Sequence, residues 1–141
     1  DKLSRRDLID NMNRTASLIA EAGGQSPTVM RPPGGNCSTL KGNIDLPIIN
    51  WSVDTNDWRK KGNAGNAAAA RELADYIINE VNGNPGSIVL MHDIYPSTKE
   101  AACRIIPRLI SMGYQLVTVD ELARYKNVSL EKGKTYYSFA N

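Results

Sequence analysis

Segments with the spacing of helices alternate along the chain with short apolar runs, and this alternation constrains the fold more than any other feature. Residues 4–22 and 67–81 place apolar side chains on one helical face, and a glycine-containing stretch follows each of them. Residues 87–91 form a continuous apolar run, which is typical of a strand covered on both faces of a parallel sheet. The order predicts an α/β fold with parallel strands.

The expected elements cover most of the 141 residues. In chain order they are a helix over 4–22, strands over 27–30 and 46–51, a polar loop over 52–66, a helix over 67–81, a strand over 87–91, a helix over 97–112, a strand over 113–119 and a short final helix. We expect Ser97 and Glu100 to form a capping box, Pro107 to kink its helix, and Asp120 to cap the last helix. Four strands do not close a barrel, so we expect them to belong to a larger sheet.

Composition excludes some classes of partner. The net charge of +2 arises from 17 basic and 15 acidic residues spread along the chain. Phosphate backbones require a clustered basic surface, so we expect no nucleic-acid partner. No window reaches the roughly 18 consecutive apolar residues that cross a bilayer. The first residues lack an initiator Met and do not resemble a signal peptide, so we interpret Asp1 as the edge of a fragment or of a processed product, with any export signal upstream.

The two cysteines, Cys37 and Cys103, match no metal-binding or redox spacing. The sequence leaves open whether they pair. A small thiol is a common residue of a protein core, so we favour two thiols without a catalytic role.

Polar side chains follow three of the predicted strands at their carboxyl ends. Arg31 follows the first strand, the cluster DTNDW at 54–58 follows the second, and the single histidine, His92, follows the third. In barrels of parallel strands the active site forms at this end, where the loops converge. Taken singly, each has a structural interpretation: His92 as a hydrogen-bonding residue, Asp54 as a turn cap, Arg31 in a surface ion pair and Trp58 in the core. Their shared position predicts a common site.

Three segments resemble motifs of a known family. RPPGG at 31–35, DTNDW at 54–58 and LMHD at 90–93, in this order and at these separations, are similar to three motifs of the polysaccharide deacetylases, the NodB-homology domain of carbohydrate esterase family 4. The resemblance covers almost the whole chain. It implies a partial (β/α) barrel of the polysaccharide deacetylase type, in which residues 1–141 form the C-terminal portion of the catalytic domain.

Two further motifs of that family do not occur in these residues. One is a Thr-Phe-Asp-Asp type element with the catalytic base and a metal ligand, and the other is a His-x-x-x-His type element with two more ligands. With one histidine, the chain cannot assemble such an Asp-His-His site, so we assign no metal ligand within it. The resemblance implies a divalent metal, commonly zinc, held by the N-terminal strands and motifs missing from this chain, and it makes that N-terminal half a partner of these residues.

The resemblance also implies catalytic roles. The enzyme would remove N-acetyl groups from a polysaccharide, with peptidoglycan N-acetylglucosamine as the first choice, a chitin-like polymer next and acetylated xylan third. His92 would be the general acid that protonates the departing amine, and Asp57 would stabilise the imidazolium. Arg31 would hold the catalytic Asp of the missing segment by a charge-assisted hydrogen bond.

Four other residues are candidates for substrate binding. The backbone N–H of Gly34, where relatives often carry Tyr, would help to stabilise the oxyanion. Leu90 and Trp58 would form the wall of the pocket for the acetyl methyl group. Asp54, like Asp93, would support either the loop or the site.

Two other classes of function remain open. One is a non-catalytic carbohydrate-binding or scaffold domain of the same fold, and the other is an unrelated small α/β binding module. The presence of the two remaining motifs in upstream sequence would favour the enzyme. On the enzyme interpretation the isolated chain is expected to be inactive, and the whole protein is expected to be extracellular or associated with the cell envelope, where such polymers lie.

Overall fold

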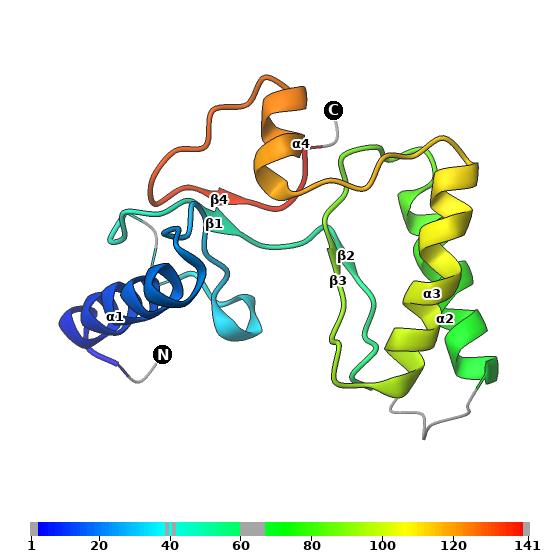
Figure 1. Cartoon of the computed structure of the whole chain (residues 1–141), viewed down its shortest axis with the longest axis horizontal. Helices are drawn as coiled ribbons and strands as arrows, with labels where there is room; N and C mark the ends of the chain where they lie inside the picture. Colours follow the sequence, from blue (N-terminus) through cyan, green and yellow to red (C-terminus); the bar gives the residue numbers. More distant parts are fainter. Residues whose placement is uncertain (1–2, 39, 41, 60–66, 140–141) are drawn as a thin grey trace. The chain divides into compact units, whose positions relative to one another are not determined.

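The structure, a computed structural model, describes residues 3–38, 40, 42–59 and 67–139 (Figure 1). Its elements in chain order are α1 (Arg5–Gly23), the 3-10 turn η1 (Pro33–Gly35), β1 (Ile48–Ile49), β2 (Val53–Asp54), α2 (Ala67–Val81), β3 (Val89–Leu90), α3 (Pro96–Ser111), α4 (Val119–Tyr125) and β4 (Thr135–Tyr136). They fall into two compact units, the first made of Asp1–Asn50 with Ala123–Tyr136 and the second of Trp51–Leu122 with Tyr137–Asn141.

The strands pair in parallel within each unit. In the first unit β1 pairs with β4, with Ile48 opposite Thr135 and Ile49 opposite Tyr136. In the second unit β2 pairs with β3, with Val53 opposite Val89 and Asp54 opposite Leu90 (Figure 1). Both pairs join segments far apart in sequence, as parallel connections require. The prediction of parallel strands is confirmed.

The first unit packs around β1. Ile48 is fully buried and contacts a small core of Cys37, Leu40 and Ile44. α1 begins at the N-cap Ser4, whose hydroxyl accepts the N–H of Asp7 at 3.2 Å, and it ends at Gly24 in the left-handed region with φ of 73°. None of its residues is fully buried, and one of its faces lines a groove of about 610 Å³. The helix predicted over 4–22 is confirmed.

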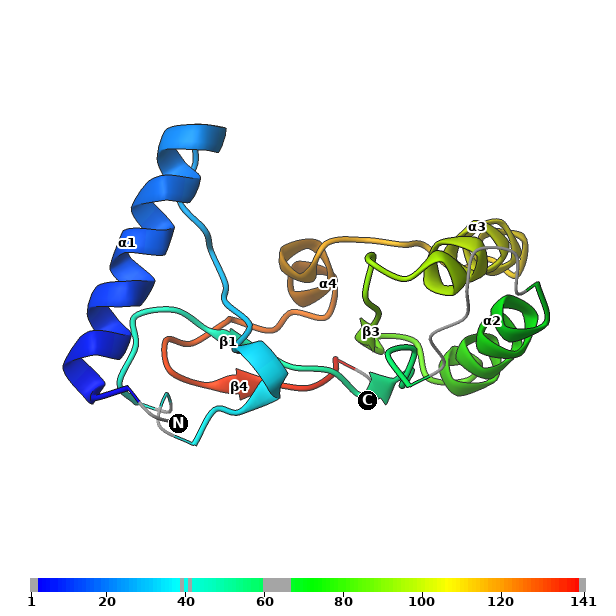
Figure 2. The same cartoon turned by 90° about the horizontal axis from the view of Figure 1, so that it is seen from below.

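The second unit is a helix pair packed on β2. α2 and α3 lie side by side in both views (Figure 1, Figure 2). Their facing side chains recur at helical spacing and form one core with Val53: Leu73, Ala74, Ile77, Ile78, Val81, Ala101, Ile105 and Leu109. Burying a side chain of Leu or Ile size contributes about 1.5–3 kcal/mol, so this seam is the main support of the unit. α2 has the predicted bounds, and Pro107 lies inside α3 without ending it.

Several expected strands differ from the observed ones. Residues 27–30 form only an isolated bridge, between Met30 and Ile48, and residues 114–118 belong to no strand of the described chain. Tyr114 instead packs on the helix core, with its hydroxyl donating to the carbonyl of Val81 at 3.1 Å. The strands predicted over 46–51 and 87–91 are confirmed in position but only two residues of each form a ladder.

β2 and β4 were not expected. β2 lies within the predicted polar loop 52–66, of which residues 60–66 lie outside the described part of the chain. β4 is two residues long and follows the charged and glycine residues of 131–134, so neither strand has a continuous apolar run that would distinguish it from a loop.

The two predicted helix caps were wrong. α3 starts at Pro96, one residue before the proposed box, and its N-cap Tyr95 has no side-chain capping bond. Proline is favoured at the first helical position because its ring fixes φ, and this places Ser97 inside the helix. At α4 the cap is Thr118 rather than Asp120: its hydroxyl accepts the N–H of Glu121 at 3.3 Å, while the Glu121 carboxylate accepts the N–H of Thr118 at 2.8 Å.

The two cysteines occupy different environments. Cys37 is buried in the first unit, where its thiol donates to the carbonyl of Gly35 at 3.4 Å, and Cys103 is exposed on α3. Both are thiols, as the sequence interpretation favoured. Among the described residues, no helix has both the length and the apolar character needed to span a membrane.

Candidate active site around Asp57 and His92

A hydrogen bond connects the loop after β2 to the end of β3. The Thr55 hydroxyl donates to the carbonyl of Leu90 at 2.7 Å and accepts the N–H of Asp57 at 3.4 Å. Both Thr55 and Asp57 are buried. The parallel pairing of β2 with β3 brings these two strand ends to one edge, so the loop that carries Asp57 lies beside the loop that carries His92.

The Asp57 carboxylate is fully buried and accepts four hydrogen bonds. Oδ1 accepts the N–H of Trp58 at 2.9 Å and lies 2.7 Å from Nδ1 of His92. Oδ2 accepts the N–H of His92 at 2.7 Å and the hydroxyl of Thr98 at 2.8 Å. A carboxylate offers about four lone-pair positions, so every acceptor position of this group is used.

Hydrogen bonding controls the charge of Asp57. Burial acts to raise the pKa of the carboxyl group, but the hydrogen bonds from the His92 ring, the His92 backbone and the Thr98 hydroxyl outweigh burial and hold the pKa below its usual value of 3.8. Asp57 is therefore ionised at neutral pH, and it presents a negative charge to the imidazole ring.

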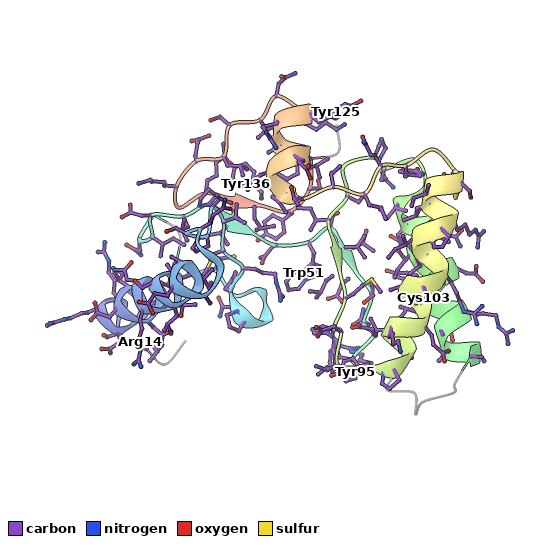
Figure 3. All side chains as sticks on the ribbon, viewed as in Figure 1. Arg14, Trp51, Tyr95, Cys103, Tyr125 and Tyr136 are labelled. Atoms are coloured by element: carbon purple, nitrogen blue, oxygen red, sulfur yellow. The ribbon has the colours of Figure 1, made fainter. Side chains whose placement is uncertain are left out.

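The contact with Asp57 determines which ring nitrogen of His92 is available for proton transfer. A carboxylate only accepts, so Nδ1 carries the proton that it donates to Asp57. Nε2 makes no hydrogen bond with the described residues, and the His92 side chain is 34% exposed. Tyr95 contacts the ring edge-on with a centroid distance of 6.0 Å, and Figure 3 labels it in the turn from β3 into α3. The pair therefore offers Nε2 for proton transfer.

Three other predicted residues lie in the same unit. Leu90 ends β3 and is 9% exposed, whereas Trp58 is 42% exposed and stacks against the guanidinium of Arg59 at 4.8 Å. Asp54 accepts the N–H of Asn56 at 2.9 Å, so it caps the turn after β2. Asp54 therefore has the turn-capping role that the sequence allowed. The roles of Leu90, Trp58 and Asp54 in substrate binding stay predictions.

Arg31 and Gly34 belong to the first unit. Arg31 is exposed and precedes η1, and Gly34 lies within η1 with φ of 65°, a conformation that glycine adopts without strain. Asn50 supports this turn by donating from Nδ2 to the carbonyl of Gly35 at 3.0 Å. The meeting of Arg31 with His92, which the sequence predicted, stays a prediction.

Sequence reasoning missed Thr55 and Thr98, the two hydroxyls that connect the Asp57 loop to its neighbours. Thr55 lies inside the DTNDW motif, which is a signal for its position, whereas Thr98 lies between Ser97 and Glu100 of the expected capping box, where no sequence pattern indicates a contact with Asp57. In the described part of the chain, no three side chains of the His, Cys, Asp or Glu type gather as metal ligands would.

The known proteins that this chain resembles are deacetylases and esterases. No protein-family model matches the sequence. The chain is 37% identical over 137 residues to the peptidoglycan-N-acetylglucosamine deacetylase PgdA of Listeria monocytogenes, covering 96% of this chain and 27% of that protein. It is 32% identical over 126 residues to the peptidoglycan-N-acetylmuramic acid deacetylase PdaC of Bacillus subtilis, covering 89% of this chain and 25% of that protein.

Among solved structures, a family 4 acetyl xylan esterase from Clostridium thermocellum in complex with a cobalt ion is similar, with a TM-score of 0.82 and 31% identity over 97% of this chain and 65% of that one. The fold is thus α/β, a partial (β/α) barrel. The resemblance to the polysaccharide deacetylases, carbohydrate esterase family 4, that was noted in the sequence is confirmed. The chain spans about a quarter of the length of these curated relatives, 27% and 25%.

Proposed function

We propose that this chain is the C-terminal portion of a deacetylase domain and that it supplies the general acid for removing N-acetyl groups from a polysaccharide. The observation that carries the proposal is the buried, ionised Asp57 with its Oδ1 atom 2.7 Å from Nδ1 of a partly exposed His92. The deacetylase names of the relatives support the class of reaction.

The proton-transfer step follows from this geometry. Hydrolysis of an acetamide adds water to the carbonyl carbon and then breaks the carbon–nitrogen bond, and the nitrogen must gain a proton to leave as an amine. In the proposal Nε2 of His92 gives that proton, and Asp57 stabilises the imidazolium before the transfer. The products are acetate and the free amine of the sugar.

Other residues would complete the site. In the proposal the base that deprotonates the water is an Asp outside these 141 residues, and Arg31 orients it by a charge-assisted hydrogen bond. The N–H of Gly34 stabilises the oxyanion, Leu90 and Trp58 enclose the acetyl methyl group, and Asp54 keeps their loop in place.

The described residues of this chain do not form a metal site. The full sequence has one histidine, its Nδ1 is engaged by Asp57, and the described residues contain no group of three potential ligands. The cobalt ion of the acetyl xylan esterase supports a divalent metal in the family, and in the proposal zinc would take its ligands from the N-terminal half of the domain.

The proposed substrate is peptidoglycan N-acetylglucosamine, with chitin-like polymers and acetylated xylan as further possibilities. The names of the relatives in Listeria and Bacillus support a peptidoglycan substrate, and a similar xylan deacetylase of Cellvibrio japonicus supports the wider class. Because peptidoglycan lies outside the membrane, we place the protein at the cell envelope or outside the cell as part of the proposal.

The test is His92→Gln in the protein that carries this chain, with acetate release measured on acetylated peptidoglycan and on N-acetylglucosamine oligomers. Loss of a general acid is expected to lower kcat by about 100-fold or more, with oligomer binding and the melting temperature retained. Unchanged turnover would exclude His92 from the mechanism. A wild-type protein that binds oligomers and releases no acetate from any acetylated polysaccharide would instead be the carbohydrate-binding alternative.

A further inference from the structure

One hydroxyl of the described chain reaches the Asp57 carboxylate from a helix. Thr98 lies in the first turn of α3, 41 residues from Asp57, and its Oγ1 donates to Oδ2 at 2.8 Å. Only 3% of Thr98 is exposed, and its own N–H donates to the carbonyl of Tyr95 at 3.0 Å. Both its backbone and its side chain therefore hold the turn that follows His92.

The other donors to Asp57 come from loops. The N–H of Trp58 and the backbone and ring of His92 all belong to the segments between strand and helix. α3, by contrast, is fixed by packing: Ala101, Ile105 and Leu109 lie in the core of the unit, against α2. Thr98 thus links the carboxylate to a helix that is anchored in the hydrophobic core of the unit.

We propose that Thr98 is a positioning residue, which orients the Asp57 carboxylate so that Asp57 in turn holds Nδ1 of His92 in its protonated tautomer. The inference rests on the proposed role of His92 as general acid. Without the hydroxyl, three of the four hydrogen bonds remain, but Oδ2 keeps a single donor, the N–H of His92, so the carboxylate is held less firmly about its Cβ–Cγ bond. Any rotation moves Oδ1 away from Nδ1 and weakens the contact that orients the ring.

Two variants separate the hydroxyl from the shape of the side chain. Thr98→Val keeps the volume and removes the donor, whereas Thr98→Ser keeps the donor and removes a methyl group. In the protein that carries this chain, Thr98→Val is expected to lower kcat for acetate release by about 10-fold to 100-fold with KM nearly unchanged, since small misplacements of reacting groups reduce turnover on this scale. Because Thr98→Ser keeps the donor, its kcat is expected to lie within about 3-fold of the wild-type value. This loss is much smaller than the one expected for Thr98→Val.

The matched control is Thr15→Val, which removes the hydroxyl of an exposed threonine in α1, where it donates to the carbonyl of Asn11. This control is expected to leave kcat unchanged. Thr98→Ser that is as slow as Thr98→Val, or Thr98→Val with normal kcat and a normal melting temperature, would overturn the proposal.

A readout without turnover separates this inference from the proposed function. The 15N shifts of the His92 ring, assigned by their disappearance in His92→Gln, report which nitrogen carries the proton when the ring is neutral. We expect the Nδ1–H form in the wild type and in Thr98→Ser, and a mixture with the Nε2–H form in Thr98→Val. Normal turnover of His92→Gln would defeat the proposed function alone, and unchanged ring shifts in a folded Thr98→Val would defeat the positioning role alone.

Discussion

His92 is held to Asp57 at two points: its backbone N–H donates to Oδ2 at 2.7 Å and its ring Nδ1 lies 2.7 Å from Oδ1. One carboxylate therefore sets both the path of the loop and the orientation of the ring. A change at Asp57 is expected to affect folding and proton transfer together, whereas a change at the exposed Nε2 side of His92 affects proton transfer alone.

Asp57→Asn tests the first part of this relationship. The amide replaces one acceptor oxygen by an NH2 group, which would face two donors in a buried position and leave them without an acceptor. We expect the unfolding free energy to fall by about 1–3 kcal/mol, the usual cost of an unsatisfied buried group, as measured by urea unfolding. The control Asp75→Asn, which weakens the surface pair with Arg108, is expected to cost about 1 kcal/mol or less. Equal losses in the two variants would contradict the prediction.

The stability that Asp57 contributes is expected to disappear in acid. Burial acts to raise the pKa of Asp57, but the hydrogen bonds from His92 and Thr98 lower it below its ordinary value of 3.8. A carboxylate with a lowered folded pKa stabilises the fold above its unfolded pKa, and this contribution is lost as the pH falls through the folded value. The difference in unfolding free energy between the wild type and Asp57→Asn should shrink as the pH falls below 3.8. A difference that grows as the pH falls below 3.8 would have the wrong sign.

The capping box of α4 predicts a loss of stability without a loss of activity. Thr118→Ala removes the hydroxyl that accepts the N–H of Glu121, and the loss of such a cap costs about 0.5–2 kcal/mol. Thr15→Ala removes a threonine from an exposed interior position of α1, where alanine is the better helix former, so it should be neutral or slightly stabilising. Urea unfolding of both variants checks the difference, and equal midpoints would show that the Thr118 bonds contribute nothing.

The packed interface between α2 and α3 predicts where truncation of a side chain lowers the unfolding free energy most. Leu73 in α2 is 2% exposed and lies in the core, whereas Leu18 in α1 is 54% exposed. Leu73→Ala should cost about 2–5 kcal/mol, because it removes buried methyl groups and leaves a cavity. Leu18→Ala should change the unfolding free energy by about 0.5 kcal/mol or less, as surface substitutions usually do. Similar losses measured in urea would mean that α1 is as well buried as α2.

The parts of the fold that the sequence predicted are those with a strong local signal. Residues 67–81 combine good helix formers with apolar side chains at helical spacing, and α2 has those bounds. Residues 113–119 also carry an apolar run, but it packs on the helices through Tyr114 and forms no ladder in the described chain. Tertiary contacts, which the local pattern does not contain, decide whether such a segment forms a strand.

For the candidate site, too, some contacts could be predicted from the sequence and others depend on tertiary packing. Asp57 and His92 come after strands whose carboxyl ends meet, so their proximity could be predicted from element order. Thr98 could not, because a threonine at the start of a helix has several possible hydrogen-bond partners and only the packing of α3 selects Asp57. The cap at Thr118 was missed for a similar reason, since Asp120 is also a good capping residue and helix boundaries are uncertain by one or two positions.

Zinc titration tests where the metal ligands lie. The chain has one histidine, whose Nδ1 is engaged by Asp57, and its described residues contain no group of three potential ligands, so we expect calorimetry on these 141 residues to show no tight stoichiometric zinc binding. A structural or catalytic zinc site needs three or four such ligands from the protein. The longer protein with the N-terminal half of the domain is expected to bind one zinc, and His92→Gln should retain that binding because His92 is not among the proposed ligands. One tight site in the 141 residues, abolished by His92→Gln, would make His92 a metal ligand and remove it as the general acid.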